Sequence, residues 1–160
     1  MGHLQISRLI PAPTSEVFRH ITELRNLPDW LGPASFSGLQ VDFPSSLPQL
    51  KERAEFEAVF VRFGVSVHVV ARVDECELNK RFAYHQVSGF FRSWSHTQVL
   101  TSHDANTTVL TDLVDFRLPY GIFGALADDL FLRNDLEKIL MHRLIRIEHH
   151  FQDPHRYKPE

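Results

Sequence analysis

A run of five alternating segments constrains the fold of this chain more than any other feature. The segments are Glu52–Phe63, Val65–Cys76, Lys80–Ser88, Arg92–His103 and Thr107–Leu118. Apolar and polar residues alternate along them, which is the period of a strand with one buried face. Because only short breaks separate the segments, the pattern predicts an antiparallel meander of consecutive hairpins.

If each break is a tight turn, the pairing places almost every large apolar residue on one face of the sheet. That face carries Phe56, Ala58, Phe60, Val65, Val67, Val69, Ala71, Val73, Phe82, Tyr84, Gln86, Trp94, His96, Gln98, Leu100, Leu110, Asp112, Val114 and Phe116. The opposite face carries mostly charged and hydroxyl side chains. A slip of one residue at any turn would mix the two sets. The sequence therefore predicts a sheet with one apolar face that another element must cover.

The segments before the meander predict two further strands and two short helices. His3–Pro11 and Ser35–Phe43 have the pattern of strands. A helix is expected to begin at a cap formed by Thr14 or Ser15. Its apolar stripe continues as far as Leu24, and the segment 27–30, Leu-Pro-Asp-Trp, is expected to break it before a short second helix or turn.

The segment after the meander predicts a long helix. From about Ile122 to His150 the apolar residues recur with a period near 3.6. The stripe consists of Leu132, Leu136, Ile139, Leu140, Leu144 and Ile147. Such a helix is about 40 Å long, enough to cover the apolar face of the sheet. We therefore expect one domain over residues 1–152, followed by a loose polar tail over residues 153–160.

Composition excludes several classes of protein. A net charge of −3 without a basic cluster argues against a nucleic-acid partner. The single Cys76 leaves no internal disulfide and no cysteine-based metal site. No apolar run is long enough to span a membrane, and no signal peptide is recognisable, which favours a cytoplasmic protein. No phosphate-binding or dinucleotide-binding glycine motif occurs, and the ten histidines show no chelating arrangement, so neither a cofactor nor a metal is expected.

Several motifs resemble those of one superfamily. They are Ile10-Pro11-Ala12-Pro13, Glu16-Val17-Phe18, Leu27-Pro28-Asp29-Trp30, the segment Phe90–His96 and the segment Leu110–Gly121. With these motifs the chain, from about residue 3 to 150, resembles the SRPBCC superfamily, which includes START domains, birch-pollen-allergen-like domains and bacterial proteins of the polyketide cyclase/dehydrase type. The resemblance implies an α+β helix-grip fold: a seven-stranded curved antiparallel sheet wrapped around a long C-terminal helix, with two short helices after the first strand. It implies little about activity, because this superfamily includes carriers, cyclases and hydrolases.

A small polar cluster falls on the predicted apolar face. It consists of Tyr84, Gln86, His96, Gln98 and Asp112, and the pairing sets Tyr84 opposite His96, Gln86 opposite Trp94, and Gln98 opposite Asp112. These groups would satisfy one another's hydrogen bonds or orient a ligand. Alternatively, His96 would act as a general acid/base supported by Asp112, with Tyr84 as a second proton donor. Arg143 falls on the inward stripe of the long helix, where Asp112 or a ligand carboxylate would be its partner, unless its head group extends to the surface.

The sequence thus favours binding of a small hydrophobic molecule, such as a lipid, polyketide or isoprenoid-like compound, between the sheet and the long helix. The expected apolar lining is Phe56, Phe60, Val67, Val69, Phe82, Trp94, Leu100, Phe116, Leu136 and Leu140. The expected polar contacts are Tyr84, Gln86, His96, Gln98, Asp112 and Arg143. Two alternatives remain: a cyclase, dehydratase or hydrolase that uses His96, and an accessory protein with a collapsed cavity that acts on a protein partner. The sequence leaves a monomer and a homodimer equally open.

Overall fold

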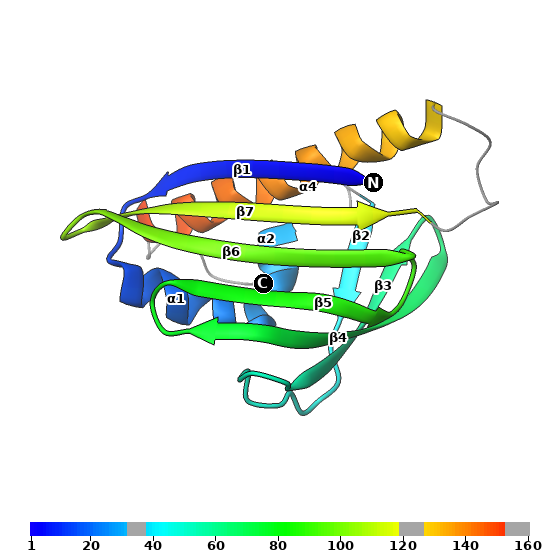
Figure 1. Ribbon diagram of the computed structural model, residues 1–160, viewed down its shortest axis with the longest axis horizontal. Coiled ribbons are helices and arrows are strands. Elements are labelled where there is room, and N and C mark those ends of the chain that lie inside the picture. Colours follow the sequence, from blue (N-terminus) through cyan, green and yellow to red (C-terminus); the bar gives the residue numbers. More distant parts are fainter. Residues whose placement is uncertain (32–37, 119–126, 153–160) are drawn as a thin grey trace.

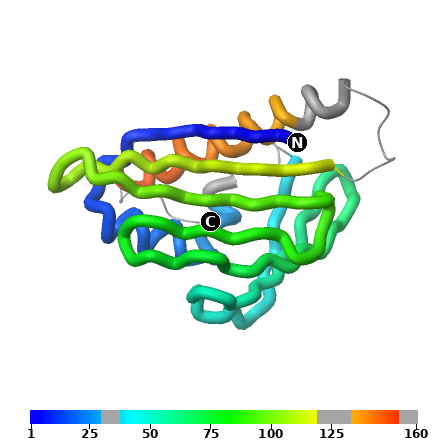
Figure 2. The backbone as a smooth tube through the Cα atoms, in the orientation of Figure 1, coloured from blue at the N-terminus to red at the C-terminus, as the bar shows by residue number. Residues whose placement is uncertain are grey.

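A computed structural model describes the backbone of residues 1–31, 38–118 and 127–152. Its sheet is antiparallel and consists of β1 (Gly2–Ile10), β2 (Leu39–Asp42), β3 (Glu55–Arg62), β4 (Val65–Glu77), β5 (Arg81–Ser88), β6 (Ser93–Asp104) and β7 (Thr107–Arg117). The strand order is β1-β7-β6-β5-β4-β3-β2. Strands that follow one another in sequence therefore lie side by side from β2 to β7, and β1 closes the far edge beside β7 (Figure 2).

The helices in the described part of the chain lie on one side of this sheet. They are α1 (Thr14–Thr22), the 3-10 turn η1 (Leu24–Asn26), α2 (Leu27–Leu31) and α4 (Ala127–Gln152). In Figure 1 the sheet is in front and α1, α2 and α4 are behind it, so the viewer faces its uncovered side. The α+β helix-grip architecture expected from the sequence is confirmed.

The predicted division of the meander into two faces is also confirmed. On the inner face, Phe82, Leu110 and Phe116 are at most 1% exposed. On the outer face, Glu55 and Arg72 are exposed. Most buried inner-face residues form one core with residues of α1 and α4, and Ala58 packs with Val41 and Ile139 in a second, smaller cluster. The hydrophobic effect therefore fixes the register of the sheet, because a slip by one residue would expose this core.

The turn pattern did not predict the register shifts of the ladders, which occur at Val70/Ala71 and Val73/Glu75 of β4 and at Ser102/Asp104 of β6. Val73 pairs with Tyr84, but the next pair is Glu75 with Ala83, so β4 has one extra residue there. The bulge reverses the facing of the strand, and Cys76 turns inward to pack against the core. Its Sγ lies 3.8 Å from the carbonyl oxygen of Leu50.

The start of α1 differs from the sequence prediction. The N-cap residue is Pro13, and no side chain caps the helix, so the predicted cap at Thr14 or Ser15 is wrong. The carbonyl of Pro13 instead accepts hydrogen bonds from the backbone N–H groups of Glu16 and Val17 at 3.0 and 3.1 Å. A proline fits this place because it has no N–H and its φ, here −60°, is fixed near −65°.

The break after α1 also differs in detail. The chain leaves the helix at Glu23, where ψ is 93°, and Leu24 reaches the core from η1 rather than from α1. The segment 27–30, expected to break the helix, forms most of α2. Pro28 is tolerated there because the first turn of a helix does not use its N–H groups for intrahelical bonds.

The long helix α4 covers the inner face and contacts β1 and α2. Ile139, Leu140, Leu144 and Ile147 are buried on its inward stripe, as predicted. The predicted start at Ile122, the first residues of the predicted strand over residues 35–43, and the predicted tail over residues 153–160 lie outside the described residues. The described part of that strand is β2.

Candidate functional site

Three adjacent strands bring three polar side chains together beneath α4. Tyr84 of β5 pairs directly with His96 of β6, as predicted, and the Tyr84 hydroxyl lies 2.9 Å from His96 Nδ1. On the other side of His96, its Nε2 lies 3.2 Å from Asp112 Oδ1 of β7. The diagonal contact expected between His96 and Asp112 is therefore present. His96 is 3% exposed and Asp112 is fully buried.

Arg143 of α4 completes this set, which we name the interior polar chain: Tyr84, His96, Asp112 and Arg143. Its Nη1 donates a hydrogen bond of 2.6 Å to Asp112 Oδ2, and the residue is 2% exposed. The head group therefore does not extend to the surface. Of the two partners considered from the sequence, a protein carboxylate and a ligand carboxylate, the structure provides the first.

The electrostatics of the interior polar chain favour an ionised Asp112. Burial disfavours its charged form, but the Arg143 guanidinium and His96 outweigh burial and hold the pKa of this carboxyl below its usual range. Tyr84 behaves in the opposite way. Desolvation is the main reason that its pKa rises to about 12, so it stays a neutral hydroxyl.

These charges imply one tautomer of His96. A carboxylate only accepts hydrogen bonds, so the proton of a neutral His96 is best placed on Nε2, facing Asp112. Nδ1 is then the acceptor for the Tyr84 hydroxyl. The interior polar chain can therefore hold a proton or pass it from Tyr84 through His96 toward Asp112. Arg143 neutralises the charge of the Asp112 carboxylate.

Three buried atoms in this region retain unused hydrogen-bonding capacity among the described residues. They are His96 Nε2, Asp112 Oδ1 and Gln98 Oε1. The first two lie within ion-pair distance of each other, but their contact lacks good hydrogen-bond geometry. Gln98 is 3% exposed and pairs in register with Asp112, as predicted. Buried polar groups normally find partners, so this cluster is unusual for a purely structural core.

Gln86 does not join this cluster, and its predicted pairing with Trp94 is wrong. The ladder between β5 and β6 ends at His85 and Ser95. Beyond it, the Gln86 amide donates a 2.6 Å hydrogen bond to the carbonyl of Phe91 and accepts a 3.4 Å bond from its N–H. Gln86 therefore fixes the loop between the two strands, and Phe91 packs on Trp94 with ring centroids 4.8 Å apart.

The residues expected to line an apolar site all lie on the inner face of the sheet or on the inward side of α4. Phe56, Phe82, Leu100, Phe116 and Leu140 are buried, and Phe60, Val67, Val69, Trp94 and Leu136 are half-buried. The ring of Tyr84 packs edge-on against Phe56, with centroids 5.4 Å apart. The interior polar chain is thus surrounded by aromatic and aliphatic side chains, where the effective dielectric constant is low.

A histidine pair beside Arg143 was not predicted from the sequence. His20 of α1 stacks on His150 of α4, with ring centroids 4.1 Å apart and an interplanar angle of 20°. Desolvation, followed by the charges of His150, Arg143 and Arg19, lowers the pKa of His20 to about 4. The available signal was its position three residues after the buried Val17, which places it at the edge of the apolar stripe of α1.

Arg62, at the end of β3, forms an ion pair with Asp135 of α4. In the described part of the chain, no group of three or more His, Cys, Asp or Glu side chains is placed to hold a metal ion. Among the helices described, none is long and apolar enough to cross a membrane.

The fold is similar to those of several proteins of known structure. A START superfamily protein from Mycobacterium smegmatis is similar, with a TM-score of 0.68, 10% identity, and coverage of 95% of this chain and 98% of that one. Ara h 8.0201 is similar, with a TM-score of 0.66, 15% identity and coverage of 95% and 98%. DynU16, from the dynemicin biosynthetic locus, has a TM-score of 0.61 and 18% identity over 95% of this chain and 48% of that one.

No protein-family model and no curated protein matches the sequence. At these low identities the structural similarities show the fold alone. The fold expected from the resemblance to the SRPBCC superfamily is therefore confirmed, and this chain has the helix-grip fold of START-type proteins.

Proposed function

We propose that the protein binds a small hydrophobic molecule, such as a lipid, polyketide or isoprenoid-like compound, between the inner face of the sheet and α4. The observation that carries this proposal is the buried polar cluster in an apolar interior: Gln98 Oε1 has no hydrogen-bond partner among the described residues, and His96 Nε2 and Asp112 Oδ1 meet only at 3.2 Å with poor hydrogen-bond geometry. Ligand sites combine an apolar wall with a few such groups that orient the ligand. The structural likeness to a START superfamily protein supports the same proposal.

The division of labour within this site follows from the geometry. The apolar lining, including Phe56 and Phe82, would supply most of the binding free energy by removing ligand surface from water. Tyr84, His96 and Gln98 would set the orientation, because each offers hydrogen-bonding atoms on the inner face. Arg143 would act indirectly, since its Nη1 is engaged by Asp112.

Native mass spectrometry of freshly purified protein, compared with its denatured mass, tests this proposal directly. A discrete excess mass that disappears on denaturation, followed by extraction and identification, is the expected result. A control pair uses adjacent positions on opposite faces of β4: Val67→Trp fills the inner face and Ser66→Trp adds the same bulk outside. Only Val67→Trp should reduce binding. Equal loss in both variants, or retention in both, contradicts a ligand between sheet and helix.

A second candidate function is catalysis by the interior polar chain. Tyr84, His96 and Asp112 form a line of proton-transfer groups with contacts of 2.9 and 3.2 Å, which suits a general acid/base. In a cyclase, dehydratase or hydrolase, His96→Gln should abolish turnover of the extracted ligand while changing its affinity only slightly. Equal loss of turnover and affinity would assign His96 to binding alone. If no ligand is ever found bound to the protein, the remaining alternative is favoured: an accessory protein with a collapsed cavity that acts on a protein partner.

A further inference from the structure

Gln98 provides the most specific information about the chemistry of the proposed ligand. Its side chain is buried on the inner face between Phe82, its partner in β5, and Asp112, its partner in β7. Its Oε1 has no hydrogen-bond partner among the described residues. A buried amide left in this state costs free energy, so the site is complete only when another group approaches it.

The neighbouring groups determine which chemical group fits. Gln98 Oε1 is an acceptor without a partner, and the Asp112 carboxylate on the next strand is also an acceptor, so this place requires a donor. An alcohol or phenol hydroxyl supplies a donor, and its oxygen can also accept a hydrogen bond. A carboxylate supplies acceptors only. A half-turn of the Gln98 amide would present N–H groups instead, but the Asp112 carboxylate beside it would still repel an anion.

The charges of the site lead to the same choice. Asp112 is already neutralised by Arg143 through a 2.6 Å hydrogen bond, so this buried pair has no net charge. A ligand anion would have to compete with Asp112 for Arg143, and a ligand cation would lie close to the Arg143 guanidinium. Either one would bring an uncompensated charge into a low-dielectric interior, which is costly.

Building on the proposed function, we propose that this site selects neutral, hydroxyl-bearing hydrophobic molecules, alcohols or phenols, over the corresponding carboxylates. Gln98 is the residue that determines this specificity. It receives the ligand hydroxyl, and the ion pair between Asp112 and Arg143 keeps the surroundings neutral. Free fatty acids and other lipophilic anions are therefore excluded as preferred ligands.

Three compounds with one ring system test this: naphthalene, 2-naphthol and 2-naphthoate, titrated at pH 7 and followed by ligand fluorescence or calorimetry. We expect 2-naphthol to bind at least about tenfold more tightly than naphthalene, the value of about one net buried hydrogen bond. We expect 2-naphthoate to bind more weakly than 2-naphthol by at least the same factor. Equal or tighter binding of 2-naphthoate overturns the proposal.

Two glutamine variants assign the effect to its residue. Gln98→Leu, or Gln98→Met if that variant folds poorly, should reduce the preference for 2-naphthol over naphthalene to about twofold. Gln86→Met is the matched control, because the Gln86 amide is already bound to Phe91, and it should leave the preference intact. An unchanged preference in the Gln98 variants overturns the role of Gln98. Naphthalene binding without a preference for 2-naphthol overturns only this inference, whereas no binding of any of the three compounds contradicts the proposed function as well.

Discussion

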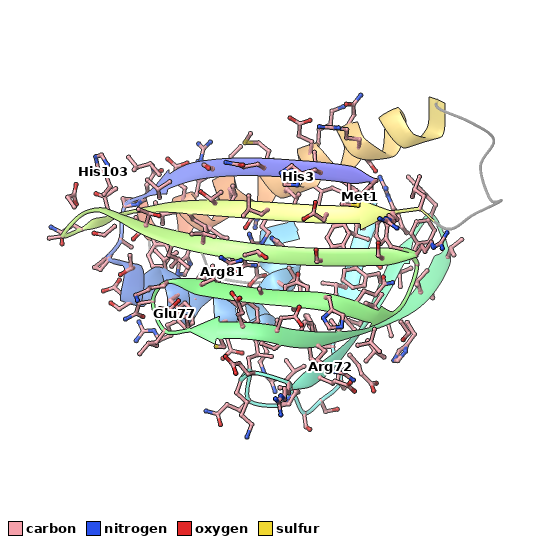
Figure 3. All side chains as sticks on the ribbon, in the orientation of Figure 1. Met1, His3, Arg72, Glu77, Arg81 and His103 are labelled. Atoms are coloured by element: carbon pink, nitrogen blue, oxygen red, sulfur yellow. The ribbon has the colours of Figure 1, made fainter. Side chains whose placement is uncertain are left out.

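Histidine–aspartate and arginine–carboxylate pairs occur on both faces of this sheet, in opposite surroundings. On the outer face, His85 Nδ1 lies 2.8 Å from Asp74, and the side chains are 38% and 45% exposed. On the inner face, the side chains of His96 and Asp112 are 4% and 0% exposed. The labelled outer residues in Figure 3, including His3, Arg72 and Arg81, are on the face turned away from the helices.

The comparison shows that contact distance alone says little about what a pair contributes. An exposed pair exchanges interactions with water for interactions with its partner, so its net contribution is small. A buried pair has lost its water entirely, and each member depends on the other to compensate that loss. The outer pairs are therefore replaceable, while the interior polar chain is sensitive to every change in charge.

The largest difference is expected from the same substitution made on each face. Asp112→Asn leaves the buried Arg143 without a counter-charge and should lower the free energy of unfolding by about 3–5 kcal/mol. Asp74→Asn removes the exposed partner of His85 and should change it by less than about 0.5 kcal/mol. Urea unfolding at pH 7 measures both values.

Replacing both members of the buried pair sharpens this test. The double variant Asp112→Leu, Arg143→Met removes both charges together and should regain most of the stability lost in Asp112→Asn. Similar losses in Asp112→Asn and Asp74→Asn would mean that the interior is not a low-dielectric site. In that case the electrostatic basis for ligand selection would fail too.

The next largest effect concerns acid sensitivity. The pKa of His20 falls from 6.5 to about 4 in the folded protein, chiefly through desolvation. Between these values the unfolded chain binds a proton that the folded chain does not, so stability falls as the pH drops from about 6.5 to 4. His20→Phe keeps an aromatic ring beside His150 and should abolish about 2 kcal/mol of this loss, a value reduced for partial exposure of the ring.

The control for His20 is an exposed histidine on the outer face. His68→Phe makes the same substitution at a ring that is 56% exposed, so it controls for the exchange of imidazole for phenyl outside the core. Thermal unfolding at pH 7 and pH 5 compares the two variants with the parent protein. If His20→Phe kept the full acid sensitivity, the stacked pair would not be its source.

Substitutions of the two inner-face glutamines should change the free energy of unfolding by about 1 kcal/mol each, with opposite signs. Gln98→Leu removes an unpaired buried acceptor and should raise the free energy of unfolding by about 1 kcal/mol. Gln86→Met removes the hydrogen bonds that hold Phe91 and should lower it by about 1 kcal/mol. A decrease for Gln98→Leu in the ligand-free protein would show that the Gln98 amide already has a structural partner.

The sheet faces and the covering helix were predictable from sequence because they depend on periodicity alone. Alternation in β3 to β7 defined the core face, and the inward placement of Arg143 followed from its spacing relative to Ile139 and Leu140. The contacts of Tyr84 with His96 and of His96 with Asp112 followed from antiparallel register. The register of an antiparallel pair predicts such contacts whenever both strands are regular.

What sequence could not predict depends on irregular backbone or on contacts distant in the chain. The bulge at Val73 and Glu75 adds a residue without any glycine or proline to indicate it. The Gln86 amide turned to Phe91 because the ladder ends one residue earlier than the turn pattern implied. His20 and His150 meet because the end of α1 contacts the last turns of α4, and the sequence does not encode that contact locally.

The smallest effect is expected on the outer face and completes the comparison. Arg72 Nε donates a 2.9 Å hydrogen bond to Glu55 Oε1, although both side chains are nearly half exposed. A double-mutant cycle with Arg72→Met and Glu55→Gln should give a coupling free energy below about 0.5 kcal/mol, falling further in 1 M salt. The corresponding cycle for Asp112 and Arg143 should give several kcal/mol and little salt dependence, because counter-ions do not enter the core. A salt-insensitive coupling on the outer face would indicate that a partner or a second subunit covers it, and would make that face a binding surface.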